Sequence, residues 1–428
     1  MRRWWLALLL CAGCGATPPV QSALRGSLSD LKRDIESAEQ AGKLDRASVI
    51  DLAHAVAARE LTSAVGAPGA ARVRRLRGCA RPLGHAMEQR AQQDDDIAAE
   101  LTLILVERRV VDGPALVQRY ARSANGAWRA VAARAAERAI DTDLRRAFYV
   151  DPDQRVRRAA LATARQVHDA RELEILLEAA RVDPDPQSKS LAVTACGAIG
   201  GERAVLALKD LWASADDSLR IAIVDAWSDP ASLATGGARE LSIAAERGGG
   251  LAAVSASYAQ ARTGGPEATV ANARLRHFIV DGTDDEKRLA LRVVTLDPET
   301  EAAVVRAAHE ASPELEVVAL GRLAVLPARR AEALSALRTR VNETPSSPAA
   351  QSAHDAALLA LADLGDHSIA ATLAAGLQAK SRQTRWDSAR SLASLDEYSR
   401  VAPGLADDDA DLRSDLACTL LARENARR

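Results

Sequence analysis

The chain has 428 residues, of which 48% are hydrophobic but only 3% aromatic, and its formal net charge is −2. This length exceeds what one globular core accommodates, so we expect several domains or an array of repeats. The apolar residues are mostly Ala, Leu and Val, which favour packed helices over a sheet. The absence of a basic excess argues against a general nucleic-acid-binding protein.

The chain begins with the features of a secretion signal, MRRWWLALLLCAGC. Arg2 and Arg3 form a short basic region, and the run from Trp4 to Leu10 is apolar. The run is too short to span a bilayer as a finished helix. We therefore expect a signal that directs export.

The end of this signal resembles a bacterial lipobox, because the small residues Ala12 and Gly13 precede Cys14. The resemblance implies that residues 1–13 are a lipoprotein signal peptide and that Cys14 is the lipidation site. Cys11 departs from the pattern, since it stands where Leu is usual. The alternative is a simple signal peptide that is cut near Ala16.

Gly15, rather than Asp, follows Cys14. By resemblance to enterobacterial sorting rules, this favours a lipid-anchored protein of the bacterial cell envelope, at the outer membrane. Residues 14–27 contain Pro18 and Pro19 among small polar neighbours, and this composition predicts a flexible tether.

Three further cysteines, Cys79, Cys196 and Cys418, lie far apart in the sequence. Their spacing fits neither a disulfide framework nor a metal site. We expect each of them to fill a small space in a helix packing face.

Residues 28–124 have helical apolar spacing without a longer period. Leu28, Leu31 and Ile35, for example, lie on one helix face. We predict an N-terminal helical cap on a repeat array, because the terminal units of such an array need a different outer face. A small separate domain is the alternative.

A longer period begins after this region. A basic residue recurs after an acidic or polar turn and before an Ala-rich helix, at intervals of about 30 residues or two to three times that length. These residues are Arg129, Arg157, Lys189, Arg220, Arg288, Arg385 and Arg413. A unit of this length holds two helices and their turns, and neighbouring units must stack to bury their apolar faces.

The fullest copy, DPDQRVRRAALATA, begins at Asp151 and resembles the HEAT/armadillo repeat family. That family typically places Asp six residues before Arg, a spacing kept by Asp151 and Arg157 and by Asp407 and Arg413. The resemblance implies that these four residues form a structural ladder between successive repeats. Their use as ligand contacts is the alternative.

The same resemblance implies an all-α fold in which residues 125–428 form a HEAT-like α-α superhelix, a helical repeat solenoid, with residues 28–124 as its N-terminal cap. An N-capping Asp or Ser before Pro recurs along the chain and predicts helix starts. These pairs lie at Asp151-Pro152, Asp183-Pro184, Asp229-Pro230, Asp297-Pro298, Ser312-Pro313 and Ser347-Pro348.

Motifs for phosphate binding, nucleophilic catalysis and zinc binding are missing from the sequence. Asp407, Asp409 and Asp411 have the first spacings of a calcium loop, but Leu412 replaces the Gly that such a loop requires. We therefore predict no catalytic residues, no metal site and no cofactor.

These features predict a membrane-tethered lipoprotein that acts as a non-enzymatic scaffold. We expect a protein or peptide partner on the concave face of the solenoid, attachment to the membrane through the lipid anchor, and no nucleic-acid partner. One alternative is a HEAT-like enzyme or enzyme subunit of lyase type, as in the phycobilin lyases that resemble this repeat type. Another is a passive structural protein of the envelope.

Overall fold

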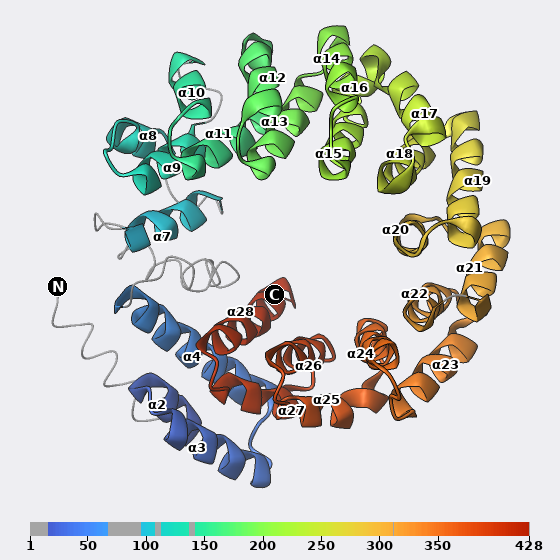
Figure 1. The fold of residues 1–428 in the computed structure, drawn as a ribbon. Coiled ribbons are helices and arrows are strands. Elements are labelled where there is room, and N and C mark those ends of the chain that lie inside the picture. The colour runs from blue at the N-terminus through green and yellow to red at the C-terminus, as the bar shows by residue number, and fades with distance from the viewer. Residues whose placement is uncertain (1–15, 67–95, 108–112, 137–141, 311, 428) are drawn as a thin grey trace. The chain divides into compact units, whose positions relative to one another are not determined.

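A computed structural model of the chain describes residues 16–66, 96–107, 113–136, 142–310 and 312–427. Throughout these ranges the regular elements are helices, and no strand occurs among them (Figure 1). The predicted all-α, solenoid-like fold is confirmed. The proposed lipidation site Cys14 and the signal peptide lie outside the described residues.

The chain divides into two compact units. Unit 1 comprises Met1–Val110 and Leu358–Arg428, and unit 2 comprises Val111–Ala357. Both ends of the chain therefore contribute to unit 1, whereas unit 2 is one continuous segment. Helix α24 (Pro348–Asp363) crosses the boundary between them.

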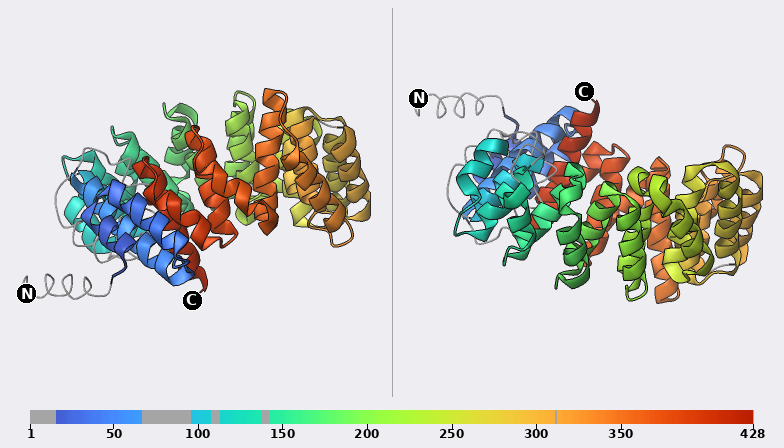
Figure 2. Two further views of the ribbon diagram at one scale, coloured as in Figure 1. Left: turned by 90° about the horizontal axis from the view of Figure 1, so that it is seen from below. Right: turned by 90° about the horizontal axis from the view of Figure 1, so that it is seen from above.

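Unit 2 is a double row of antiparallel helices (Figures 1 and 2). Its inner row is α9 (Gly126–Ala135), α11 (Gln154–Val167), α13 (Pro186–Ile199), α15 (Asp217–Trp227), α18 (Gly250–Thr263), α20 (Asp284–Val293) and α22 (Pro313–Leu323). Its outer row is α8 (Gly113–Tyr120), α10 (Thr142–Tyr149), α12 (Leu173–Val182), α14 (Glu202–Trp212), α17 (Ala238–Arg247), α19 (Gly265–Asp281), α21 (Pro298–Glu310) and α23 (Arg330–Asn342). Short turns of helix, η2 (Ala170–Glu172), α16 (Pro230–Ser232) and η3 (Leu233–Gly237), join some of these helices.

Small side chains let the inner helices approach closely. On α13, Ala192, Ala195 and Cys196 are fully buried, and a Cβ atom at Gly197 would meet the backbone of Ala226 on α15 at 2.5 Å. The Ala-rich composition therefore becomes close helix packing between neighbouring repeats. Each helix buries one apolar stripe that it could not bury alone.

Four of the six Asp-Pro and Ser-Pro pairs lie at helix starts, as predicted, and the predictions from the other two pairs are wrong. Helices α16, α21, α22 and α24 begin at Pro230, Pro298, Pro313 and Pro348. Helices α11 and α13 begin two residues later than predicted, because Asp153 and Asp185 are the N-caps. The side chains of Asp151 and Asp183 are engaged by arginines instead.

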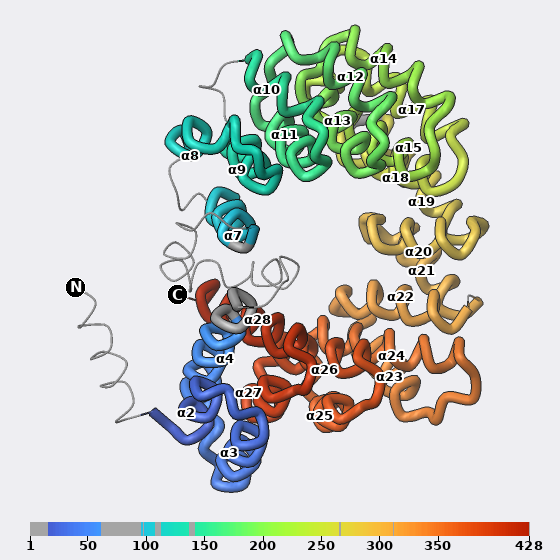
Figure 3. The backbone as a smooth tube through the Cα atoms, turned by 60° about the vertical axis from the view of Figure 1, so that its left-hand side comes forward, coloured from blue at the N-terminus to red at the C-terminus, as the bar shows by residue number. Residues whose placement is uncertain are grey.

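Unit 1 brings the two ends of the chain together. Its described helices are α2 (Pro18–Arg25), α3 (Leu28–Gln40), α4 (Arg46–Gly66), α7 (Asp96–Glu107), η4 (His367–Ile369), α25 (Ala370–Gly376), α26 (Arg382–Ser394), α27 (Tyr398–Val401), η5 (Ala402–Ala406) and α28 (Ala410–Arg427). Helix α4 packs along α28, and α3 packs on η5 (Figure 3). Val49, Leu52 and Val56 of α4 are buried.

The predicted flexible tether over residues 14–27 is wrong for its larger part, because Pro18–Arg25 is helix α2. Thr17 has extended backbone and Pro18 occupies the first helical position, where its missing N–H would have no partner in any case. The helix packs on α3 and α4, and its Pro19, Ser22 and Ala23 are buried.

The predicted cap over residues 28–124 differs from the structure in two respects. Helices α3 and α4 pack against α27, η5 and α28 of the C-terminal segment within unit 1, while α8 pairs with α9 in unit 2. Helix α28 leaves an apolar inner face that α4 covers. Within unit 1, the N-terminal helices therefore cover the C-terminal repeats.

The cysteines also differ from the prediction in one case. Cys196 is a free, buried thiol, as expected of a packing residue, and burial raises its pKa to about 12. Cys418 is buried as well, but it is disulfide-bonded rather than free. A cysteine pair distant in sequence gives no signal in spacing alone.

Candidate functional site

The arginines of the predicted ladder share one geometry, which Arg157 shows fully. Its Nε and Nη2 donate to the Asp183 carboxylate at 2.7 and 3.2 Å. Its Nη1 donates to the backbone carbonyls of Asp151 and Pro152 at 2.9 and 3.2 Å. One guanidinium group therefore ties the turn of its own repeat to the turn of the next.

The same contacts recur at Arg129 with Asp151, Arg385 with Asp407, and Arg413 with Glu60. Asp151 and Arg157 thus lie in adjacent steps of the ladder and do not form an ion pair with each other. The same holds for Asp407 and Arg413, because Asp407 accepts from Arg385 of the preceding repeat. The Asp of each predicted pair accepts hydrogen bonds from the Arg of the preceding repeat. The Arg of the pair donates to a carboxylate of the neighbouring unit on its other side, Asp183 for Arg157 and Glu60 for Arg413.

A second aspartate two residues later explains why these turns are acidic. The Asp183 carboxylate accepts the N–H of Asp185 at 2.9 Å. Asp185 in turn caps α13 by accepting the Ser188 N–H, and it forms an ion pair with Arg158 at 2.5 Å. Asp409 caps α28 in the same way and forms an ion pair with Arg382. The acidic run at residues 407–411 is therefore used for capping and for the ladder.

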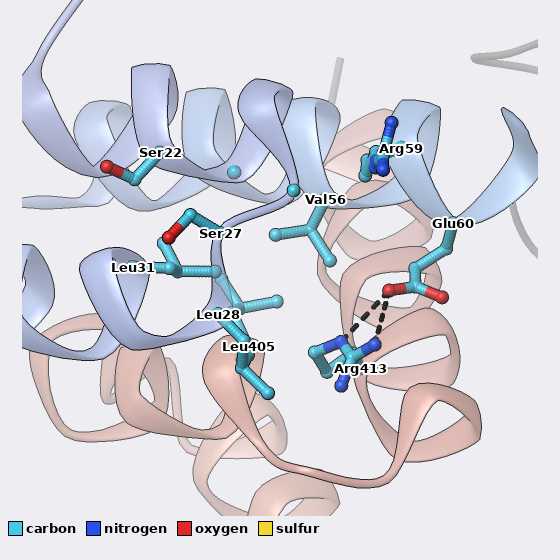
Figure 4. A pocket seen from close by; sticks show the side chains of 11 residues that line it. Ser22, Ser27, Leu28, Leu31, Val56, Arg59, Glu60, Leu405 and Arg413 are labelled. Atoms are coloured by element: carbon cyan, nitrogen blue, oxygen red, sulfur yellow. Dashed lines mark hydrogen bonds and ion pairs between the residues drawn. The ribbon is translucent and has the colours of Figure 1, made fainter. Parts of the chain in front are cut away.

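The last step of the ladder is completed from the N-terminal part of the chain. Glu60 of α4 accepts from Arg413 Nε and Nη2 at 2.9 and 2.7 Å, although the two residues are 353 positions apart (Figure 4). Their side chains are only 8% and 15% exposed. They line a small cavity of about 140 Å³ together with Ser27 and Leu405. Helix α4 therefore takes the place that the inner helix of a further repeat would have.

A buried polar cluster joins α10 to the next repeat. Arg145 donates to Glu172 at 2.7 Å and to Asp169 at 2.9 Å, and the hydroxyl of Tyr149 donates to Glu172 at 2.7 Å. The side chains of Arg145 and Glu172 are 4% and 1% exposed. Burial and the neighbouring Glu172 raise the pKa of Tyr149 well above its usual value. The phenol therefore stays protonated and keeps donating to the carboxylate.

We expect acid to weaken unit 2 through Asp169. The Arg171 side chain, which hydrogen-bonds to Asp169, lowers the pKa of that carboxyl from 3.8 to about 2. A folded-state pKa below the unfolded value means that the stabilisation is fully present above pH 3.8 and is lost as the pH falls from there through about 2. Thermal unfolding followed across this range should show a smaller decrease in Asp169→Asn than in the wild type. An equal decrease in both proteins would contradict this assignment.

One candidate binding site in unit 2 is a groove between three inner helices. It has a volume of about 480 Å³ and lies between α15, α18 and α20, with α16 and η3 at one end. Pro230, Leu233, Tyr258, Leu289 and Val293 give it an apolar lining. A concave, mainly apolar cavity with a few polar groups is typical of a binding site.

Two opposite charges stand at this groove, Asp225 on α15 and Arg262 on α18. Crowding by protein atoms raises the pKa of Asp225, and Arg165 on α11 offsets part of this effect. The Arg262 guanidinium lies over the ring of Tyr258, 5.7 Å from its centroid. Among the described residues, neither Asp225 nor Arg262 belongs to an ion pair within 4 Å. Both charges are therefore open to a bound molecule.

The groove has no signature in the sequence. Its residues come from three inner helices and a connecting turn, and each helix contributes only side chains with ordinary helical spacing. Each ladder Arg can be located in the sequence, because it lies four residues after the N-cap of its helix. Asp225 and Leu289 have no comparable fixed position relative to the N-caps of α15 and α20. At one end of the groove the helix is irregular, between the Asp229-Pro230 turn and Gly236-Gly237, but an Asp-Pro pair also occurs at other turns of the chain.

The family model for HEAT repeats matches residues 144–228, which run from α10 to α15. No curated protein matches the sequence. Similar solved structures include the Escherichia coli protein YibA, with 14% identity over 73% of this chain and 96% of that one, and a TM-score of 0.29. Human deoxyhypusine hydroxylase in complex with glycerol is 16% identical over 69% and 98% of the two chains, with a TM-score of 0.24. Such low values say nothing about the function of this chain.

Proposed function

We propose that this HEAT-like repeat protein is a lipid-tethered scaffold of the bacterial envelope, and that it binds a protein or peptide partner in the groove of unit 2. The groove carries the proposal, because it joins an apolar lining to two free charges of opposite sign. Apolar side chains of a partner would enter between Tyr258 and Leu289. Asp225 and Arg262 would fix its orientation by pairing with its charges.

Two independent features support export and anchoring. The sequence from Met1 to Cys14 resembles a lipoprotein signal. Cys418 is disulfide-bonded, and disulfides persist mainly in oxidising compartments such as the periplasm. Across the described ranges, no helix has both the length and the apolar character needed to cross a bilayer. The membrane attachment that we propose is an acylated Cys14, which rests on the resemblance of the first 14 residues to a lipoprotein signal.

The variant Cys14→Ser should move from the membrane to the soluble fraction of cells, because it loses its acyl chains. Cell fractionation measures the release from the membrane. The intact mass of the mature wild-type N-terminus shows whether Cys14 carries acyl chains. Cys196→Ser is the matched control, since Cys196 is buried in α13 far from the proposed anchor in sequence. Membrane retention of Cys14→Ser would show that the anchor assignment is wrong.

A photo-crosslinking amino acid at Leu289 tests the groove in living cells. We expect one defined crosslinked product from this position. The matched control is Leu206 on α14, which is 49% exposed but lies on an outer helix. Equal products from both positions, or none from either, would count against a specific partner in the groove and would favour the passive structural alternative.

A further inference from the structure

Helix α2 begins very close to the proposed lipid anchor. Only three residues separate Cys14 from Pro18, the first residue of the helix. Four backbone steps reach at most about 14 Å even when fully extended. If Cys14 carries acyl chains that enter a bilayer, α2 must therefore stay close to the surface of that bilayer.

The two faces of α2 differ in their surroundings. Pro19, Ser22 and Ala23 are buried against unit 1. The opposite face carries the half-buried Val20 and, one turn later, Leu24, which is 45% exposed. The outer face of a short surface helix thus has an apolar row that the protein itself leaves partly uncovered.

A polar row runs beside Val20 and Leu24 on the same face. It consists of Gln21 and Arg25, and Arg25 Nη2 lies 3.4 Å from Gln21 Oε1. Arg25 is exposed and belongs to the last turn of α2. Apolar side chains flanked by an arginine are typical of helices that lie in the interface of a membrane with anionic lipids.

Helix α2 is fixed within unit 1 and cannot turn this face freely. The Ser22 hydroxyl donates to Asp34 of α3 at 2.6 Å, and Gly26 caps the C-terminus of α2 with φ of 76°. A Cβ atom at Gly26 would lie 2.5 Å from the Arg59 side chain of α4. The contacts of α2 with α3 and α4 therefore fix its orientation independently of a membrane.

We propose that the outer face of α2 lies on the membrane surface, with Val20 and Leu24 at the level of the upper acyl chains and Arg25 at the lipid phosphates. This inference rests on the proposed acylation of Cys14. It makes unit 1 the part of the protein that contacts the membrane. The acyl chains hold the protein there, and α2 fixes how unit 1 faces the lipid.

The test uses the acylated, disulfide-intact, full-length protein in vesicles of phosphatidylethanolamine and phosphatidylglycerol. An environment-sensitive fluorophore is attached at Leu24→Cys, and at Leu206→Cys in unit 2 as the matched control. The two native side chains are 45% and 49% exposed. Cys196 should not react, because it is buried and its thiol has a pKa of about 12.

We expect a blue-shifted emission at position 24 and loss of that emission when the vesicles contain nitroxide-labelled lipid. Emission at position 206 should not change. If position 24 behaves like position 206 while the acylated protein remains on the vesicles, α2 does not contact the membrane and the inference is overturned. If Cys14→Ser binds the vesicles as well as the acylated protein does, the proposed anchor fails, and the inference that rests on it fails too.

Discussion

Replacing Arg145 with alanine is expected to lower the free energy of unfolding of unit 2 by about 3–5 kcal/mol, the usual cost of leaving a buried charge without its partner. Among the described residues, Glu172, which is 1% exposed, would keep only the hydroxyl of Tyr149 as a side-chain donor. Denaturant unfolding followed by circular dichroism measures the effect as a shift of the unit 2 transition.

Two controls separate charge burial from general disruption of the Arg145 cluster. Arg171→Ala removes a neighbouring guanidinium that is 72% exposed, so its cost should be clearly smaller than that of Arg145→Ala and confined to the acid-sensitive stabilisation through Asp169. Arg145→Met with Glu172→Gln removes both charges and should recover much of the loss. A small effect of Arg145→Ala, or no recovery in the double variant, would mean that the cluster does not stabilise the fold in this way.

Replacing Glu60 with alanine should loosen the N-terminal helices from the C-terminal repeats. It leaves Arg413, 15% exposed, facing α4 without a carboxylate, and we expect a cost of about 2–4 kcal/mol, below the full value for a buried pair because the Arg413 side chain is partly solvated. Hydrogen exchange should therefore become faster in both α4 and α28. Glu60→Gln keeps one acceptor and should lose less.

The matched control for Glu60→Ala lies between the same two ends of the chain. Lys32 and Asp408 form an ion pair at 2.8 Å, but their side chains are 43% and 80% exposed. Asp408→Ala should therefore hardly change exchange in α4 and α28. Equal effects of Asp408→Ala and Glu60→Ala would contradict the role of Glu60 as the last acceptor of the ladder.

The repeat architecture was predictable because residues close together in the sequence determine each repeat. The segment from Asp151 to Arg157 holds a cap, a turn and a ladder residue within seven positions. The acceptor of Arg157 was not predictable from that segment, because Asp183 belongs to the next repeat and meets Arg157 only once the repeats stack. Local rules specify the turn, and packing decides which turns meet.

The contacts between the N-terminal and C-terminal helices of unit 1 could not be predicted from short sequence segments. Glu60 looks like an ordinary helical glutamate, and only the docking of α4 on α28 brings it to Arg413. Pro18 and Pro19 suggest a tether by composition, yet Pro18 is a favourable first residue for α2. The groove is even harder to predict from the sequence. Asp225 and Leu289 line the same groove only because α15, α18 and α20 stack side by side.

The most direct test of the scaffold is the affinity of the crosslinked partner for purified protein, measured by titration calorimetry. We compare the wild type with Leu289→Asp in the groove and Leu206→Asp on α14, after checking that all three unfold at similar temperatures. A buried contact of this kind contributes more than about 1 kcal/mol, so Leu289→Asp should weaken binding about fivefold or more while Leu206→Asp leaves it unchanged. Equal affinity of all three proteins would contradict the groove as the binding site.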